Sequence, residues 1–63
     1  MLKTAKNLKP GDRIKHDDRV VVVRCAWKKA GGAILVDYNT STTPYIGQHI
    51  FNHDDRVTVV WES

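Results

Sequence analysis

The chain has 63 residues, a mass of 7.2 kDa, a formal net charge of +3 and one cysteine. This length fits one domain and excludes two, and a domain of this size buries only about 60% of the surface that its unfolded chain exposes. A single cysteine excludes an internal disulfide, and an apolar share of 41% with a charged share of 27% is typical of a soluble globular domain rather than of a disordered chain.

Short extended segments separated by turn signals follow one another along the chain, which is the pattern of an all-β domain. Pro10-Gly11 predicts the first turn, because proline fixes φ and glycine accepts a positive φ. Asp17-Asp18 predicts the next corner, Gly31-Gly32 ends the longest strand, and no helix beyond one turn after Thr4 is indicated. The predicted strands span residues 12–15, 20–29, 33–38, 45–51 and 56–61.

Alternation along the long second strand places Val21, Val23, Cys25 and Trp27 on one face and Arg24 on the other. We expect the first face in the core, and the strand is long enough for a bend or bulge near its middle. Five such short strands bury enough apolar area when the sheet curls into a closed barrel, which also protects their edges.

One eight-residue segment occurs twice with a single difference: HDDRVVVV at residues 16–23 recurs as HDDRVTVV at residues 53–60. The simpler interpretation is one turn-then-strand device used twice, with Asp bonding its own backbone at the corner. The alternative is a duplicated cation or ligand site built from two His-Asp-Asp corners.

A family resemblance rests on the pattern Leu8-x-Pro10-Gly11-Asp12-x-Ile14, followed by a corner, a Val-rich strand, Gly31-Gly32 and Ile34-x-Val36. This pattern resembles that of small SH3-like barrels, in the style of KOW and Tudor-type modules, over about residues 7–61. The whole chain also looks like short proteins of unknown function from actinobacteria and their phages. The resemblance implies an all-β fold with a single five-stranded SH3-like small barrel over residues 1–63.

The basic residues are concentrated in the first half of the sequence. Residues 1–29 hold nine of the ten Lys and Arg residues against three Asp, whereas residues 30–63 hold one Arg against four acidic residues. Such asymmetry can mark an acidic partner, for which nucleic acid is the usual candidate. The alternative is that a sheet interleaves the two halves in space, so that the charges serve only solubility.

The first ten residues show no signal-peptide pattern, and no apolar run approaches the roughly 20 residues that span a bilayer. Together with the free cysteine, this favours a cytoplasmic protein without membrane contact.

Residue types that carry enzyme chemistry are present without the surroundings that this chemistry needs. Cys25 lies mid-strand on the predicted core face, where a thiol behaves as a small hydrophobe. A zinc site would need Cys25 together with His16, His49 and His53, and the sequence has no Cys pair. We therefore expect no catalysis, no metal and no cofactor.

Aromatic residues beside basic ones indicate a binding function. Trp27 is followed directly by Lys28 and Lys29, and nucleobases stack on aromatic rings while Lys and Arg hold phosphates. The first hypothesis is a non-catalytic module that binds nucleic acid, and the alternative for Trp27 is packing in the core or at its rim. The predicted contacts are Lys9, Arg13, Lys15, Arg24, Trp27, Lys28 and Lys29.

A protein-interaction module is the alternative hypothesis. An aromatic groove that binds a partner could be lined by Tyr38, Tyr45 and His49. We expect the neighbouring Phe51 to pack in the core instead. An exposed strand edge is another way to bind a host or sister protein. Leu35 and Val60 on otherwise polar faces fit a homodimer that completes an undersized core.

Overall fold

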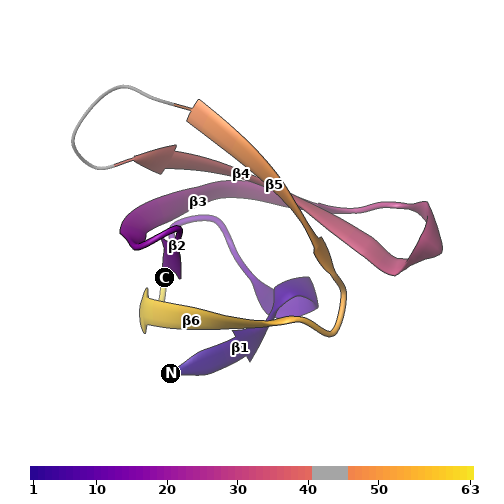
Figure 1. Ribbon diagram of the computed structural model, residues 1–63, viewed down its shortest axis with the longest axis horizontal. Helices are drawn as coiled ribbons and strands as arrows, with labels where there is room; N and C mark the ends of the chain where they lie inside the picture. The colour runs from indigo at the N-terminus through magenta and orange to yellow at the C-terminus, as the bar shows by residue number, and fades with distance from the viewer. Residues whose placement is uncertain (41–45) are drawn as a thin grey trace.

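The computed structural model describes residues 1–40 and 46–63, which form one antiparallel sheet (Figure 1). The elements in chain order are β1 (Leu2–Thr4), the 3₁₀ turn η1 (Ala5–Asn7), β2 (Arg13–His16), β3 (Arg19–Lys28), the turn η2 (Ala30–Gly32), β4 (Ala33–Thr40), β5 (Ile46–Asn52) and β6 (Arg56–Trp61). The strand order is β1-β6-β2-β3-β4-β5, and every pair of neighbours is antiparallel. The all-β prediction is confirmed, and the five predicted strands are present with ends shifted by at most two residues.

The prediction of a five-stranded closed barrel is wrong, because the described residues form six strands in an open sheet. The additional strand is β1, which pairs with β6 in a segment where no strand was predicted. Within the described ranges, β1 and β5 are the two edges of the sheet. The sheet curls until β6 and β1 lie across the interior from β3 and β4 (Figure 1), so its concave face buries a core without a closing ladder of hydrogen bonds.

Apolar side chains from four strands fill this concave face. Ile14 of β2, Val36 of β4 and Val59 of β6 are each at most 2% exposed, and β3 contributes neighbours of the same kind. Ala5 of η1 and the following Leu8 belong to the same cluster, so the short turn packs against the core. Alternate residues of the strands point to the convex face, which is the surface available to a partner.

A β-bulge at Arg24 reverses the face that each later residue of β3 occupies. Val23 and Cys25 pair with consecutive residues of β4, so Arg24 is left over in the ladder. Beyond the bulge, Cys25 and Trp27 therefore lie on the convex face. A bulge near the middle of this strand was predicted, but the assignment of Cys25 and Trp27 to the core face is wrong.

The repeated HDDR segment forms two different corners. In the first, Asp17 and Asp18 have φ angles of 50° and 61°, the left-handed pair of a two-residue hairpin between β2 and β3. In the second, neither Asp has a positive φ, and the turn has His53 and Asp54 at its corner, between Asn52 and Asp55. The Asn52 N–H donates to Oδ2 of Asp55 (2.9 Å), and the Asp55 N–H donates to the Asn52 carbonyl (3.0 Å). Both copies lie at turns that lead into strands, but the simpler interpretation of one device used twice is wrong in detail, because the two turns have different backbone geometries.

Candidate nucleic-acid interface

The seven predicted nucleic-acid contacts are all exposed and all belong to β3 or to segments beside it. Arg13 and Lys15 of β2 pair directly with β3. The turn that carries Lys9 is held to β3 by a hydrogen bond from the Gly11 N–H to the Val23 carbonyl (2.8 Å). The remaining four residues, Arg24, Trp27, Lys28 and Lys29, lie along the second half of β3 and at its end. We call these seven residues the β3 track. At about 3.3 Å per residue of β3, the track is about 30 Å long.

One end of the β3 track carries a second aromatic side chain, which the sequence analysis did not select. The Cζ atom of Arg13 lies 5.5 Å from the ring centroid of Trp61, its pairing partner in β6. Trp61 is 56% exposed, and a cation over such a ring is worth about 0.5–1 kcal/mol at an exposed site. Its aromatic type at a strand end was readable from the sequence, but its partner across the sheet was not.

Trp27 lines a shallow hollow on the convex face, at the other end of the β3 track. Lys28, Lys29, Leu35 and Gln48 complete the lining of this Trp27 hollow, whose volume is about 470 Å³. Trp27 pairs with Leu35 of β4, so the indole and the leucine side chain lie together. Because Trp27 is 44% exposed, packing in the core is excluded for it.

Lys28 belongs to two hollows. Lys28 pairs with the buried Ile34, so its side chain leaves the strand on the concave face. The side chain of its neighbour Trp27 leaves the strand on the convex face. At the end of the strand, Lys28 lines the Trp27 hollow and also a second hollow that contains Lys6 and His53. The seven predicted contacts therefore follow one strand but do not share one face.

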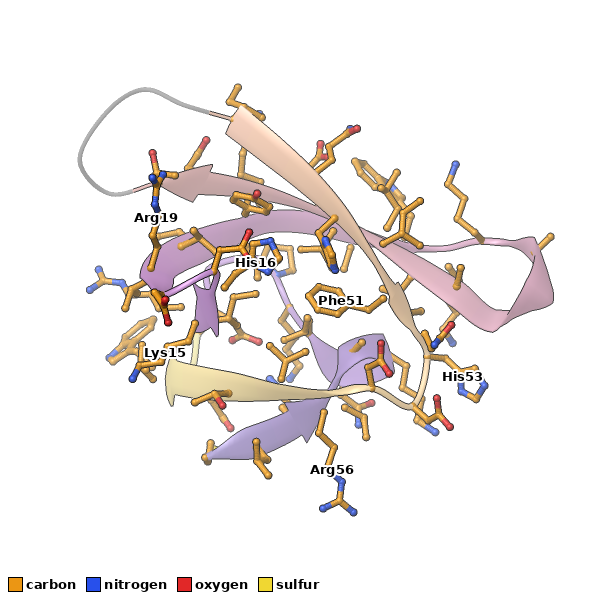
Figure 2. The ribbon with its side chains drawn as sticks, in the orientation of Figure 1. Lys15, His16, Arg19, Phe51, His53 and Arg56 are labelled. Carbon is orange, nitrogen blue, oxygen red and sulfur yellow. The ribbon has the colours of Figure 1, made fainter. Side chains whose placement is uncertain are left out.

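Two of the predicted groove residues gather with other rings on the concave face. Ring centroids lie 4.5 Å apart for His16 and His49, 4.5 Å for His49 and Phe51, and 5.3 Å for His16 and Tyr38. His16 and Phe51 point toward one another inside the curled sheet (Figure 2). Tyr45, the third predicted groove residue, lies outside the described residues.

The structure separates the residues that a zinc site would need. His16 and His49 are in contact, but Cys25 lies on the convex face, and the ring of His53 packs against Gly32 at the corner between β5 and β6 (Figure 2). Within residues 1–40 and 46–63, no group of three or more His, Cys, Asp or Glu side chains is placed to hold a metal ion.

Asp12 is a buried carboxylate that ties three segments together. Its Oδ2 accepts hydrogen bonds from Nζ of Lys3 (2.8 Å) and the N–H of Lys9 (2.9 Å), and its Oδ1 accepts one from the N–H of Ser63 (2.9 Å). Burial alone would raise the pKa of Asp12, but these three hydrogen bonds and the charge of Lys3 outweigh it and hold the pKa below its ordinary value. Lys3 is therefore committed to the fold rather than to the basic surface.

No protein-family model matches this chain, and no curated protein matches it in sequence. The likeness to SH3-like barrels accordingly extends no further than an open, all-β antiparallel sheet. In the part of the chain that the structure describes, no helical segment has the length and apolarity needed to traverse a bilayer.

Proposed function

We propose that this protein is a non-catalytic binding module that contacts single-stranded nucleic acid along the β3 track. The observation that carries the proposal is the Trp27 hollow, where a half-exposed indole lies beside Lys28 and Lys29. An unpaired base can stack on the indole while the lysines hold the adjoining phosphates. A duplex hides the faces of its bases, so this arrangement favours a single strand.

The basic residues of the β3 track extend this contact beyond one nucleotide. Arg13, Lys15 and Arg24 are exposed and follow the same strand away from Trp27. Phosphate contacts of this kind depend on the sugar–phosphate backbone and not on the base, so the binding is expected to tolerate many sequences.

Salt titration of oligonucleotide binding tests the proposal. A labelled single strand of about 12 nucleotides is titrated with the protein by fluorescence anisotropy from low to physiological salt. With four to six phosphate contacts, the slope of log K against log salt is about −3 to −4 for a single strand. Absence of binding at low salt would contradict the proposal.

Charge reversal at matched positions separates the β3 track from the general effect of net charge. Arg24→Glu removes a cation of the track, whereas Arg56→Glu makes the same charge change at an exposed site on β6. The first variant should weaken binding about tenfold or more, and adding Lys28→Glu should abolish it. Equal losses for Arg24→Glu and Arg56→Glu would show that only the overall charge matters.

A second candidate function, self-association, is favoured by the exposed apolar residues of β5. Ile46 and Ile50 are 57% and 63% exposed, and β5 is an edge of the sheet. An edge strand has unpaired backbone groups that can add a strand from a second copy of the chain.

Light scattering tests self-association directly. A dimer has about twice the mass of 7.2 kDa, and Ile50→Lys should return it to the monomer mass. A monomer at all concentrations contradicts this second function.

A further inference from the structure

The second hollow that contains Lys28 lies where three connections of the chain meet. The turn η1, the turn η2 between β3 and β4, and the corner between β5 and β6 gather at one end of the molecule, away from both termini (Figure 1). We call this the lysine hollow. Its volume is about 240 Å³, and its lining includes Lys6, Lys28, Lys29 and His53 above the apolar Ala33 and Ile34.

Backbone hydrogen bonds fix the three walls of the lysine hollow to one another. The Lys6 N–H donates to the His53 carbonyl (3.2 Å), and the His53 N–H donates to the Gly32 carbonyl (2.8 Å). The Lys29 N–H donates to the Ala33 carbonyl (2.7 Å) across the η2 turn. The cationic side chains therefore start from positions that the fold holds in place.

Gly32 sets the place of the His53 ring. A Cβ atom at position 32 would lie 2.7 Å from Cδ2 of His53, so the imidazole occupies space that only a glycine leaves open. Gly32 also has a φ of 80°, as the adjacent Gly31 has a φ of 81°, but a Cβ at Gly31 would meet nothing within 4 Å. Both glycines therefore need a positive φ, but only Gly32 is in contact with His53.

The formally charged side chains that line the lysine hollow are all lysines. Its lining contains no Asp or Glu, and Lys6, Lys28 and Lys29 make no ion pair with any described residue. Three ammonium groups around an apolar floor repel one another, and an anion seated between them would be held by several charge-assisted hydrogen bonds.

We propose that the lysine hollow is a binding site for a phosphate group. A volume of about 240 Å³ is smaller than the roughly 300–1,000 Å³ of ordinary ligand pockets, so it fits a single phosphate better than a complete nucleotide. The phosphate comes either from a small phosphate compound or from the terminus of a strand that lies on the β3 track, because Lys28 and Lys29 line both hollows. The second source rests on the proposed function, and the first does not.

Titration with inorganic phosphate tests the site alone. Amide chemical shifts of the ¹⁵N-labelled protein are followed with phosphate, and with chloride at the same ionic strength. Shifts that saturate at millimolar phosphate and cluster at Lys6, Lys29, Gly32 and His53 support the site. Shifts that match the chloride series, or that spread evenly over all lysines, overturn it.

Two pairs of variants locate the binding within the hollow. Lys6→Gln should weaken phosphate binding about fivefold to tenfold, while Arg56→Gln, at an exposed position of β6 outside the hollow, should leave it unchanged. Gly32→Ala should weaken binding by displacing His53, whereas Gly31→Ala imposes the same backbone strain without touching that ring. Equal effects of Lys6→Gln and Arg56→Gln would overturn the assignment even if neither glycine variant folds.

Oligonucleotides with and without a terminal phosphate decide between the two sources. A strand phosphorylated at one end should bind about tenfold more tightly than the unphosphorylated strand, and Lys6→Gln should remove that difference. Equal affinities exclude the strand terminus and leave the small phosphate compound as the ligand. Failure of the unphosphorylated strand to bind would contradict the proposed function, whereas failure of the phosphate titration would contradict the lysine hollow.

Discussion

Gly47 lies opposite Tyr38 in the β4–β5 ladder, and the ring of Tyr38 fills the space that a Cβ atom at position 47 would occupy. Gly47 is buried and has no positive φ, so it is required here for space and not for backbone freedom. Through this contact, β5 can approach β4 while Tyr38 stays against His16 on the concave face.

Gly47→Ala should therefore lower the free energy of unfolding by about 1–3 kcal/mol, because the added methyl group overpacks a filled site. In a Tyr38→Ala background the same substitution should cost less than about 0.5 kcal/mol, since the ring that it meets is gone. Urea unfolding of the wild type, both single variants and the double variant measures this coupling. Additive effects of the two changes would show that Gly47 and Tyr38 do not share this space.

Asp12 predicts a specific loss of stability in acid. The pKa of Asp12 is below its ordinary value of 3.8 in the folded chain, so the unfolded chain binds its proton first as the pH falls. The contribution of Asp12 to stability is complete above that ordinary value and is lost as the pH falls through the lower, folded value. Asp12→Asn should cost about 1.5–3 kcal/mol at neutral pH, and it should flatten the dependence of stability on pH in this acid range.

Asp54→Asn is the matched control for Asp12, because Asp54 is exposed and makes no ion pair with a described residue. Its effect on the free energy of unfolding should stay within about 0.5 kcal/mol. A similar flattening of the acid profile by Asp54→Asn would contradict the role given to Asp12.

Neighbouring residues of β5 test the register of this edge strand. Phe51 packs against the core and contacts the ring of His49, whereas Ile50 is 63% exposed on the other face. Phe51→Ala should lower the free energy of unfolding by about 2–4 kcal/mol, and Ile50→Ala by no more than about 0.5 kcal/mol in the monomer. Thermal unfolding of the two variants side by side gives the comparison, and a reversed order would mean that β5 faces the other way.

Local chemistry made most of the strands predictable from the sequence. β-branched residues and turn signals placed five strands to within two residues of their ends. β1 was missed because it has only three residues, too few to show an alternation of apolar and polar side chains. Its pairing partner is also far away in the sequence, since Leu2 pairs with Thr58. Pairing over such a separation leaves no local signal in the chain.

Tertiary contacts determine which face of the sheet a strand residue occupies, and they also determine the backbone geometry of a turn. The sequence allowed a bulge in β3 but did not place it at Arg24, and this one residue moves Trp27 from the expected core to the surface. The two HDDR segments adopt different φ angles, because one closes a hairpin between paired strands while the other joins strands that do not pair.

The sequence indicated which basic and aromatic residues could form a site but not how they are arranged. Exposed lysines beside Trp27 were readable from the sequence, and they lie beside it in the structure. The lysine hollow combines Lys6 of η1, Lys28 at the end of β3 and His53 at the corner between β5 and β6. Only the curl of the sheet brings these residues together.

Fluorescence of Trp27 tests the central claim most directly. Trp61→Phe leaves Trp27 as the single tryptophan, and Trp27→Phe leaves Trp61 as the matched control. If bases stack on Trp27, a single-stranded oligonucleotide should quench the emission of the Trp61→Phe protein saturably, with a midpoint that rises steeply with salt, and should quench the control less. Two results would contradict the account. One is Trp27 emission that stays constant at oligonucleotide concentrations that saturate the anisotropy signal, and the other is an absence of binding at low salt.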